Sequence, residues 1–230
     1  MDPLATIAAI GDGPRRELYE YVARQVEPVG REQAADAVGI PRATAAFHLD
    51  RLVEAGALEV DFGKRTGRTG PGSGRPAKLY RRARAEYAVS LPARHYDLAS
   101  ELLAAAIEES ERSGEAVRDA LDRVAEETGR ELGERSGGPL ETALEELGYE
   151  PRDDGAGGLV LVNCPFHRLA TSHTEVICRA NVCLIRGVAE GTGDEADVQF
   201  APRADHCCVR VAHSGYRSKS QAASSERADT

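Results

Sequence analysis

The sequence predicts an α+β fold in three parts, and three observations support this prediction. Residues before position 57 repeat apolar side chains at helical spacing between glycine and proline breaks. Residues 91–134 continue this spacing in two longer segments, and short alternating segments after Gly138 indicate strands around a helix. The expected parts are an N-terminal unit at 1–88, a central helical region at 89–135, a small α+β unit at 136–213 and a disordered tail at 214–230.

The N-terminal unit is predicted to contain three short helices followed by a hairpin. The first helix is indicated by GPRRELYEYVARQVEPVG, where apolar residues recur at steps of four up to Val26, and it should end near Pro28. The second, in REQAADAVGI, ends at Gly39, and the third begins at Pro41 and closes at Gly56. Two alternating segments, ALEVDF and PAKLYRRA, flank the basic, glycine-rich loop GKRTGRTGPGSGR. This order of elements predicts a winged helix-turn-helix.

The third helix carries side chains that we expect to contact DNA. One of its faces is apolar and should pack inward, whereas its first turn and far side point outward. In a helix-turn-helix the first turn of this helix meets base edges, where arginine reaches guanine and threonine offers a hydroxyl or a methyl group. An outward aromatic ring suits a thymine methyl group or a sugar, and basic side chains on a flexible loop suit phosphates. The predicted DNA-binding residues are Arg42, Thr44, Phe47 and Arg51 of the helix and Lys64, Arg65, Arg68 and Arg75 of the loop.

Charge is distributed unevenly along the chain. The net charge is −9, but residues 1–84 hold 14 basic and 11 acidic side chains, whereas residues 85–230 hold 15 basic and 27 acidic ones. Between Gly63 and Arg84 there are eight basic residues and no acidic residue. Because salt screens charges beyond about 8 to 10 Å, this local basic patch can attract DNA phosphates that the acidic remainder would repel.

Two helices with one apolar stripe each are predicted in residues 91–134, with a break at Ser113–Gly114. We expect the apolar stripes of these two helices to form the seam of a homodimer, because two-fold DNA sites match two-fold proteins. A solvated structural hairpin is the alternative.

The chain is expected to be cytoplasmic and to have no membrane partner. No apolar run approaches the roughly 18 residues that a membrane span requires. The N-terminus carries an acid where a secretory signal would carry positive charge, and glycine and proline interrupt its apolar run.

All five cysteines lie between Cys164 and Cys208, on three predicted elements. Cys164 follows the predicted strand GGLVLVN and shares a turn with His167, Cys178 lies on the next helix, and Cys207 and Cys208 open a later strand. In a reducing compartment such thiols are better explained as metal ligands, redox thiols or core residues than as disulfides. Ligands at this spacing can converge on one metal centre, so the predicted ligands are Cys164, Cys178, one of Cys207 and Cys208, and His167.

The remaining cysteine positions are less suited to a shared centre. Cys183 lies about 140° from Cys178 around the same predicted helix, so we expect it to pack in the core. Alternation along a strand places Cys207 and Cys208 on opposite sides, so one of them is expected to be a ligand, with Cys207 preferred because it lies nearer the turn.

The segment IPRATAAFHLDRLVEAG resembles the recognition helix of winged-helix regulators of the arsenical-repressor (ArsR-like) type, with Pro41 in place of their usual serine cap. With NCPFHRLA, EVIC and DHCCVRV it makes residues 14–212 similar to the SufR-type regulators. This resemblance implies a homodimer that binds an inverted repeat in double-stranded DNA, represses iron–sulfur assembly operons and carries an iron–sulfur cluster. By the same resemblance the cluster ligands are Cys164, Cys178 and Cys207 or Cys208. The first cysteine interval is one residue longer than in the SufR pattern, and zinc, with His167 as a fourth ligand, stays an alternative.

Two other functions fit the same residues. The first is a winged-helix regulator that senses a small molecule or the redox state of its thiols, and that binds DNA without any metal. The second is a thiol enzyme with Cys164 as nucleophile and His167 as base, although no third partner or oxyanion feature is recognisable. We therefore predict a DNA-binding regulator, not an enzyme, whose operator binding is modulated by a cluster or metal.

Overall fold

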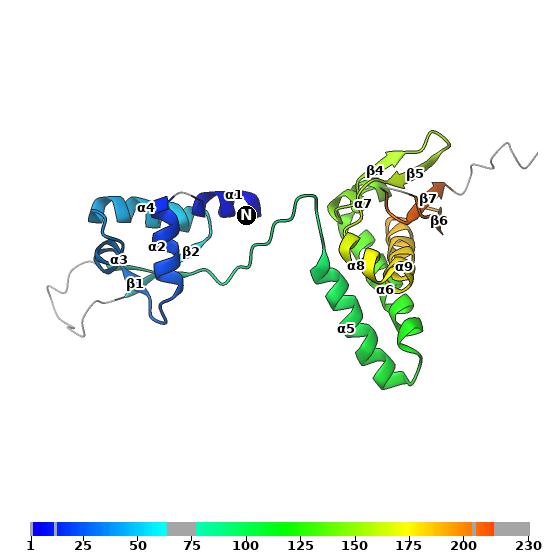
Figure 1. Ribbon diagram of the computed structural model, residues 1–230, viewed down its shortest axis with the longest axis horizontal. Coiled ribbons are helices and arrows are strands. Elements are labelled where there is room, and N and C mark those ends of the chain that lie inside the picture. Colours follow the sequence, from blue (N-terminus) through cyan, green and yellow to red (C-terminus); the bar gives the residue numbers. More distant parts are fainter. Residues whose placement is uncertain (1, 12, 64–76, 204–205, 214–230) are drawn as a thin grey trace, which may run out of the picture. The chain divides into compact units, whose positions relative to one another are not determined.

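The computed structural model describes residues 2–11, 13–63, 77–203 and 206–213 (Figure 1). The chain divides into two compact units, Met1–Val89 and Ser90–Thr230. This division falls one residue after the boundary expected between residues 88 and 89. The predicted tail at 214–230 lies outside the described residues. The predicted DNA-binding residues of the basic loop also lie outside them, namely Lys64, Arg65, Arg68 and Arg75.

The N-terminal unit contains, in its described residues, four helices and an antiparallel sheet of order β1-β3-β2. Its elements are α1 (Pro3–Ile10), α2 (Gly13–Ala23), β1 (Val29–Gly30), α3 (Arg31–Val38), α4 (Arg42–Glu54), β2 (Leu58–Gly63) and β3 (Ala77–Arg82). The sequence predicted α2, α3, α4, β2 and β3, but not α1 or β1. Helix α2 ends at Ala23 rather than near Pro28, and Val26, which was expected to continue its apolar face, is 98% exposed.

A buried tyrosine fixes α4 against the sheet. The hydroxyl of Tyr80 donates a hydrogen bond to Asp50 Oδ1 at 2.7 Å and accepts one from Arg31 Nε at 3.0 Å. Lys78 Nζ lies 3.1 Å from the same oxygen of Asp50. Burial raises the pKa of Tyr80 to about 12, so the phenol stays protonated and can keep donating to Asp50. These contacts join α3, α4 and β3, and they set the position of α4 within the unit.

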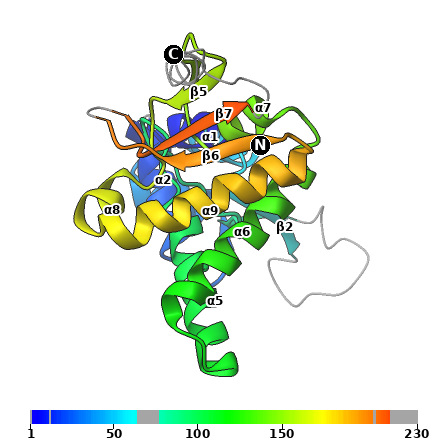
Figure 2. The same ribbon diagram turned by 90° about the vertical axis from the view of Figure 1, so that its right-hand side faces the viewer.

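The C-terminal unit combines helices with an antiparallel sheet of order β4-β5-β7-β6. Its described elements are α5 (Tyr96–Ser113), α6 (Val117–Ser136), α7 (Leu140–Glu146), β4 (Pro151–Asp153), β5 (Gly158–Leu161), α8 (His167–Ser172), α9 (Thr174–Thr192), β6 (Ala196–Phe200) and β7 (Val209–His213). Helix α9 lies between the sheet and α6 (Figure 2). Helices α5 and α6 thus share one compact unit with all five cysteines, whereas a separate helical region was expected at 89–135.

Helices α6 and α9 approach each other so closely that side chains are excluded from their contact. A Cβ atom added to Gly129 would lie 2.1 Å from Leu184 O, and one added to Gly187 would lie 1.9 Å from Glu126 O. Gly133 and Gly191 are equally tight one turn further along. The backbone of one helix can approach this closely only where the other helix has a glycine, and this contact holds α9, which carries Cys178, against α6.

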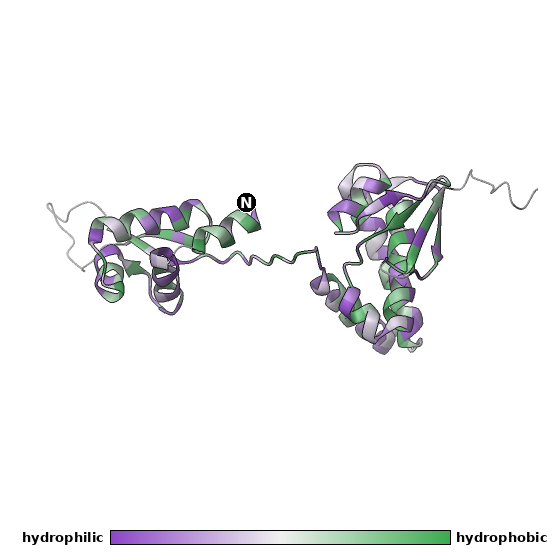
Figure 3. Cartoon of the chain, turned by 45° about the horizontal axis from the view of Figure 1, so that its top comes forward, coloured by the Kyte–Doolittle hydropathy of each residue, from purple (hydrophilic) through white to green (hydrophobic). Residues whose placement is uncertain are grey.

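The apolar stripe of α6 is only partly covered within the chain, and Val117 at its start is 47% exposed. Leu121 is buried, and Val124 and Leu132 pack against the core cluster that includes α9 and the sheet. In Figure 3 the strands of this unit are coloured mainly as hydrophobic, while the α5–α6 hairpin carries many hydrophilic positions. The closest contact with α9 is made by Gly129 and Gly133, which lie outside the expected stripe, and the dimer seam stays a prediction. None of the described helices is long and apolar enough to cross a membrane.

Candidate DNA-binding surface and cysteine pocket

Four of the five cysteines line one pocket of about 500 Å3 in the C-terminal unit. Cys164 lies in the turn between β5 and α8, Cys178 in the second turn of α9, and Cys207 and Cys208 just before β7. The structure therefore brings together sulfur atoms from three separate segments, as the spacing of the cysteines predicted. Their role as metal ligands stays a prediction.

The pocket cysteines contact one another through their thiols. Cys164 is hydrogen-bonded to Cys207, Cys207 to Cys208, and Cys208 to Cys178. The hydrogen bond with Cys207, together with burial, raises the pKa of the Cys164 thiol well above its usual range. For Cys207 the bond with Cys164 lowers the pKa, but the bond with Cys208 and burial outweigh it and raise the pKa to about 12. Burial also raises the pKa of Cys178, and the thiols of Cys164, Cys178 and Cys207 are therefore neutral at pH 7 unless a cation or an oxidant acts on them.

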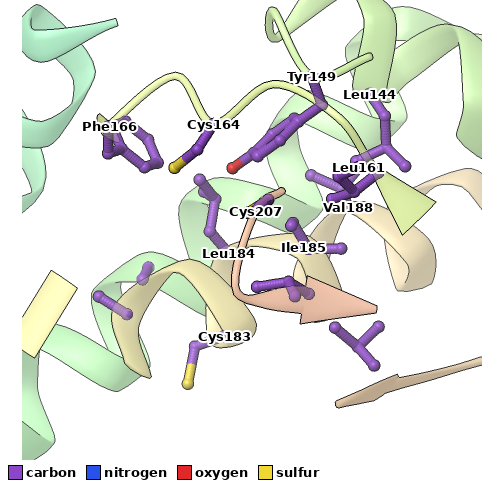
Figure 4. Packing of buried hydrophobic residues seen from close by; sticks show 14 of the residues in the cluster. Leu144, Tyr149, Leu161, Cys164, Phe166, Cys183, Leu184, Ile185, Val188 and Cys207 are labelled. Carbon is purple, nitrogen blue, oxygen red and sulfur yellow. The ribbon is translucent and has the colours of Figure 1, made fainter. Parts of the chain in front are cut away.

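The prediction that Cys207 and Cys208 face opposite sides of a strand is wrong. Regular strand backbone begins only at Val209, so the two residues precede it in a bend and both line the pocket. Cys183 is buried on α9 away from the pocket, and Figure 4 shows its sulfur pointing away from Cys164 and Cys207. Its electrostatic neighbours include Asp122 and Glu126 of α6, which fits the expected packing role.

A buried amide supports the pocket from the core side. Asn181 in the middle of α9 donates a hydrogen bond from Nδ2 to Cys207 Sγ at 3.3 Å. Its Oδ1 accepts a hydrogen bond from the hydroxyl of Tyr149, which is itself buried and lies near Cys164 and Cys207 in Figure 4. The backbone N–H of Cys207 donates to Leu161 O at 2.8 Å. The sulfur of Cys207 is thus oriented by both side-chain and backbone contacts. Sequence reasoning missed Asn181, and a polar residue on an apolar helix face was the available signal.

The charged side chains that line the pocket are cationic. These are Arg94 and Arg203; His167 and His206 also contribute to the described lining, and no carboxylate does. His167 was a predicted ligand, and the structure places it at this pocket with an exposed side chain. In the part of the chain that the structure describes, no group of three or more His, Cys, Asp or Glu side chains is arranged so that it could hold a metal ion.

The outward face of α4 carries the predicted base-reading residues in the first turn. Arg42 is exposed and its Nη1 lies 2.8 Å from Glu32 Oε1 of α3, while Thr44 is half-buried. The ion pair is between exposed groups, so it contributes little to stability and can exchange for a contact with DNA.

An aromatic and a basic side chain form a pair further along the same face. Phe47 is 59% exposed, and the guanidinium carbon of Arg51 lies 5.6 Å from its ring centroid. His48 is half-buried beside them, with its ring 5.4 Å from that of Phe47, in agreement with the packing role expected for it. The apolar face of α4 is buried as predicted, at Ala45, Leu49 and Leu52.

Residues 10–61 match the family model of a helix-turn-helix domain. The N-terminal unit is a winged-helix-type DNA-binding domain. The match covers α2, α3 and α4 together with the start of β2, and the protein is accordingly a DNA-binding transcription regulator. Comparisons with curated proteins and with solved structures gave no significant match.

Proposed function

We propose that this regulator binds an iron–sulfur cluster on its pocket cysteines and that the cluster modulates operator binding. The observation that carries the proposal is the convergence of Cys164, Cys178, Cys207 and Cys208 on one pocket whose described charged lining is entirely cationic. A thiolate-bound cluster is negatively charged, so cationic neighbours stabilise it in a unit that is otherwise acidic. Resemblance to the SufR-type regulators points in the same direction.

The donor set suits a cluster better than a single ion. The cysteines of a cluster are distributed over two or more iron atoms, so the thiolates need not meet at one point, whereas zinc requires four ligands around one centre. We therefore favour an iron–sulfur cluster over zinc on Cys164, His167, Cys178 and Cys207. When bound, a cluster would supply sensitivity to iron supply and to oxidation. Asn181 would donate to the sulfur of Cys207, and hydrogen bonds of this type tune the stability of such centres.

We further propose a cytoplasmic homodimer that acts as a repressor on an inverted repeat. The two recognition helices of a dimer would enter successive major grooves, about one helical turn apart. The stripe of α6 is only partly covered within the chain, so its exposed part, which includes Val117, can contribute to the dimer contact. Light scattering of the purified protein tests this part, and a monomeric mass at micromolar concentration with retained operator binding would contradict it.

Thiol redox sensing without a metal is a second candidate function. The hydrogen bond between Cys164 and Cys207 places two thiols in contact, and oxidation of such a pair yields a disulfide. We do not propose a thiol enzyme, because a nucleophile requires a lowered pKa and that of Cys164 is raised.

Anaerobic purification followed by iron, sulfide and zinc analysis tests the cluster. We expect iron and sulfide in the wild-type protein and their loss in Cys164→Ser and Cys178→Ser. Cys183→Ser is the matched control, since this cysteine is equally buried but lies outside the pocket, and it should keep the cluster. Wild-type protein that contains no iron or sulfide, or substitutions that leave the metal content unchanged, would overturn the proposal.

A further inference from the structure

The chain enters the C-terminal unit along the wall of the cysteine pocket. Ser90 is the first residue of this unit, and both Pro92 and Arg94 line the pocket before α5 begins at Tyr96. On the other side of the division, Tyr87 donates a hydrogen bond to Gly56 O at 3.4 Å in the DNA-binding unit. The segment between the two units is thus anchored at one end to the DNA-binding fold and at the other end to the pocket.

Hydrogen bonds tie this segment to the turn that carries Cys164. The guanidinium of Arg94 donates to Asn163 Oδ1, and Asn163 Nδ2 donates to Ala93 O at 3.0 Å. The N–H of His95 donates to Pro165 O at 3.2 Å. Asn163 is only 7% exposed, so its hydrogen-bonding groups are not competed for by bulk water. Residues 93–95 are therefore bonded to the residues immediately before and after Cys164.

A third segment, which follows α7, is hydrogen-bonded to Asn163 as well. Asn163 Nδ2 also donates to Gly148 O at 2.6 Å, after the C-terminus of α7. Gly148 has φ +75°, and a Cβ atom at this position would lie 2.9 Å from Ala93 Cβ. Because three segments are joined by hydrogen bonds at Asn163 and Pro165, a displacement of the Cys164 turn is transmitted to residues 93–95.

We propose that Arg94 and Asn163 couple the state of the cysteine pocket to the segment that leads to the DNA-binding unit. This inference rests on the proposed regulation at the cysteine pocket. In the metal-free protein, the hydrogen bonds of Arg94, Asn163 and His95 hold residues 93–95 against the turn of Cys164. Arg94 lines the pocket and its positive charge acts on Cys164, so a negatively charged centre on the thiolates attracts the guanidinium. Assembly of that centre, or oxidation of the cysteines, shifts the turn, and residues 93–95 move with it. Arg94 and Asn163 are positioning residues in this scheme.

Arg94→Met tests the coupling, because it removes the charge and the hydrogen bond but keeps the length of the side chain. Arg168→Met is the matched control, since Arg168 is an exposed arginine of α8 that does not line the pocket. Asn163→Asp is a second variant that can still accept from Arg94 but cannot donate to Ala93 and Gly148. Amide hydrogen exchange of residues 93–95 in metal-free protein should accelerate tenfold or more in Arg94→Met and Asn163→Asp, and it should not change in the control. Unchanged exchange in both variants overturns the inference.

DNA affinity is then measured on a duplex selected from a random-sequence pool, before and after two separate treatments of the pocket. One treatment is anaerobic reconstitution with iron and sulfide, and the other is oxidation of the metal-free protein with diamide. We expect at least one treatment to change the affinity of the wild type fivefold or more, and the same treatment to change that of Arg94→Met less than twofold.

The two treatments, reconstitution and oxidation, distinguish failure of the proposed coupling from failure of the proposed cluster. Failure to incorporate iron and sulfide, with a diamide effect that Arg94→Met abolishes, refutes the cluster and supports the coupling. Incorporation of the cluster with an equal effect on DNA affinity in wild type and Arg94→Met supports the cluster and refutes the coupling. Wild-type DNA affinity that responds to neither treatment refutes the coupling as well.

Discussion

Replacing Gly187 with alanine tests the close contact that positions α9. The new Cβ atom would lie 1.9 Å from Glu126 O and 2.8 Å from the backbone nitrogen of Arg130. Neither neighbour is a flexible side chain, so relief to an ordinary contact of about 3.4 Å requires the helices to separate by about 1.5 Å. Overpacking on this scale costs about 3 kcal/mol or more, of which the better helix propensity of alanine returns about 1 kcal/mol. We expect a net loss of about 2 kcal/mol in the stability of the C-terminal unit.

Urea denaturation followed by circular dichroism measures this loss. With a slope of about 2 kcal/mol per molar, the midpoint of the C-terminal transition should fall by about 1 M. Gly13→Ala is the matched control, because the same chemical change in the first turn of α2 meets nothing within 4 Å. A midpoint for Gly187→Ala that equals or exceeds that of the wild type would refute the argument that backbone contact excludes a side chain here.

Three further predictions concern charge, hydrogen bonding and the DNA surface. Tyr80→Phe removes the bond to Asp50 and should destabilise the N-terminal unit by about 1 to 2 kcal/mol. The raised pKa of Tyr80 means that its contribution is complete below about pH 10 and is lost as pH rises toward about 12, so denaturation at pH 9 and pH 11 should show an alkaline loss that the variant lacks. Arg210 Nε donates a hydrogen bond to Asp154 Oδ2 at 2.9 Å. Burial raises the pKa of Asp154, but its hydrogen bonds and the charge of Arg210 outweigh burial and lower it. The ion pair therefore stabilises the fold above about pH 4, and this stabilisation is lost on further acidification. Asp154→Asn should cost about 2 kcal/mol in thermal or urea unfolding at pH 7 and should remove this acid dependence; an equal acid response in the variant would contradict it. Phe47→Ala should change stability by no more than about 0.5 kcal/mol, because the ring is exposed, but should weaken DNA binding measured by fluorescence anisotropy; unaltered affinity would exclude a contact with DNA.

The N-terminal unit was largely predictable because local signals agree there with the tertiary contacts. Gly39 adopts φ +73° at the end of α3, and the apolar face of α4 is buried as its spacing required. Helix α1 was missed because its sequence is apolar without a clear helical period, and β1 because two residues carry no periodicity. Such elements are defined by the neighbours that they contact rather than by their own sequence.

The cysteine pocket could be predicted from the sequence only in part. Spacing along the chain indicated that cysteines from three segments converge, but it assigned Cys207 and Cys208 to opposite faces because the start of β7 was placed too early. Asn181, Arg94 and Asn163 were not identified, since their importance comes from partners 15 or more residues away in the sequence.

By itself the sequence determined the helix-turn-helix, the basic patch beside it and the grouping of cysteines behind it, because these features depend on residue type and short-range period. The tertiary structure alone decided that α6 meets α9 through its glycines in a close backbone contact, and that residues 93–95 bond to the turn of Cys164. The physical reason is that close packing and buried hydrogen bonds depend on which distant segments come into contact, and local sequence patterns do not specify those contacts.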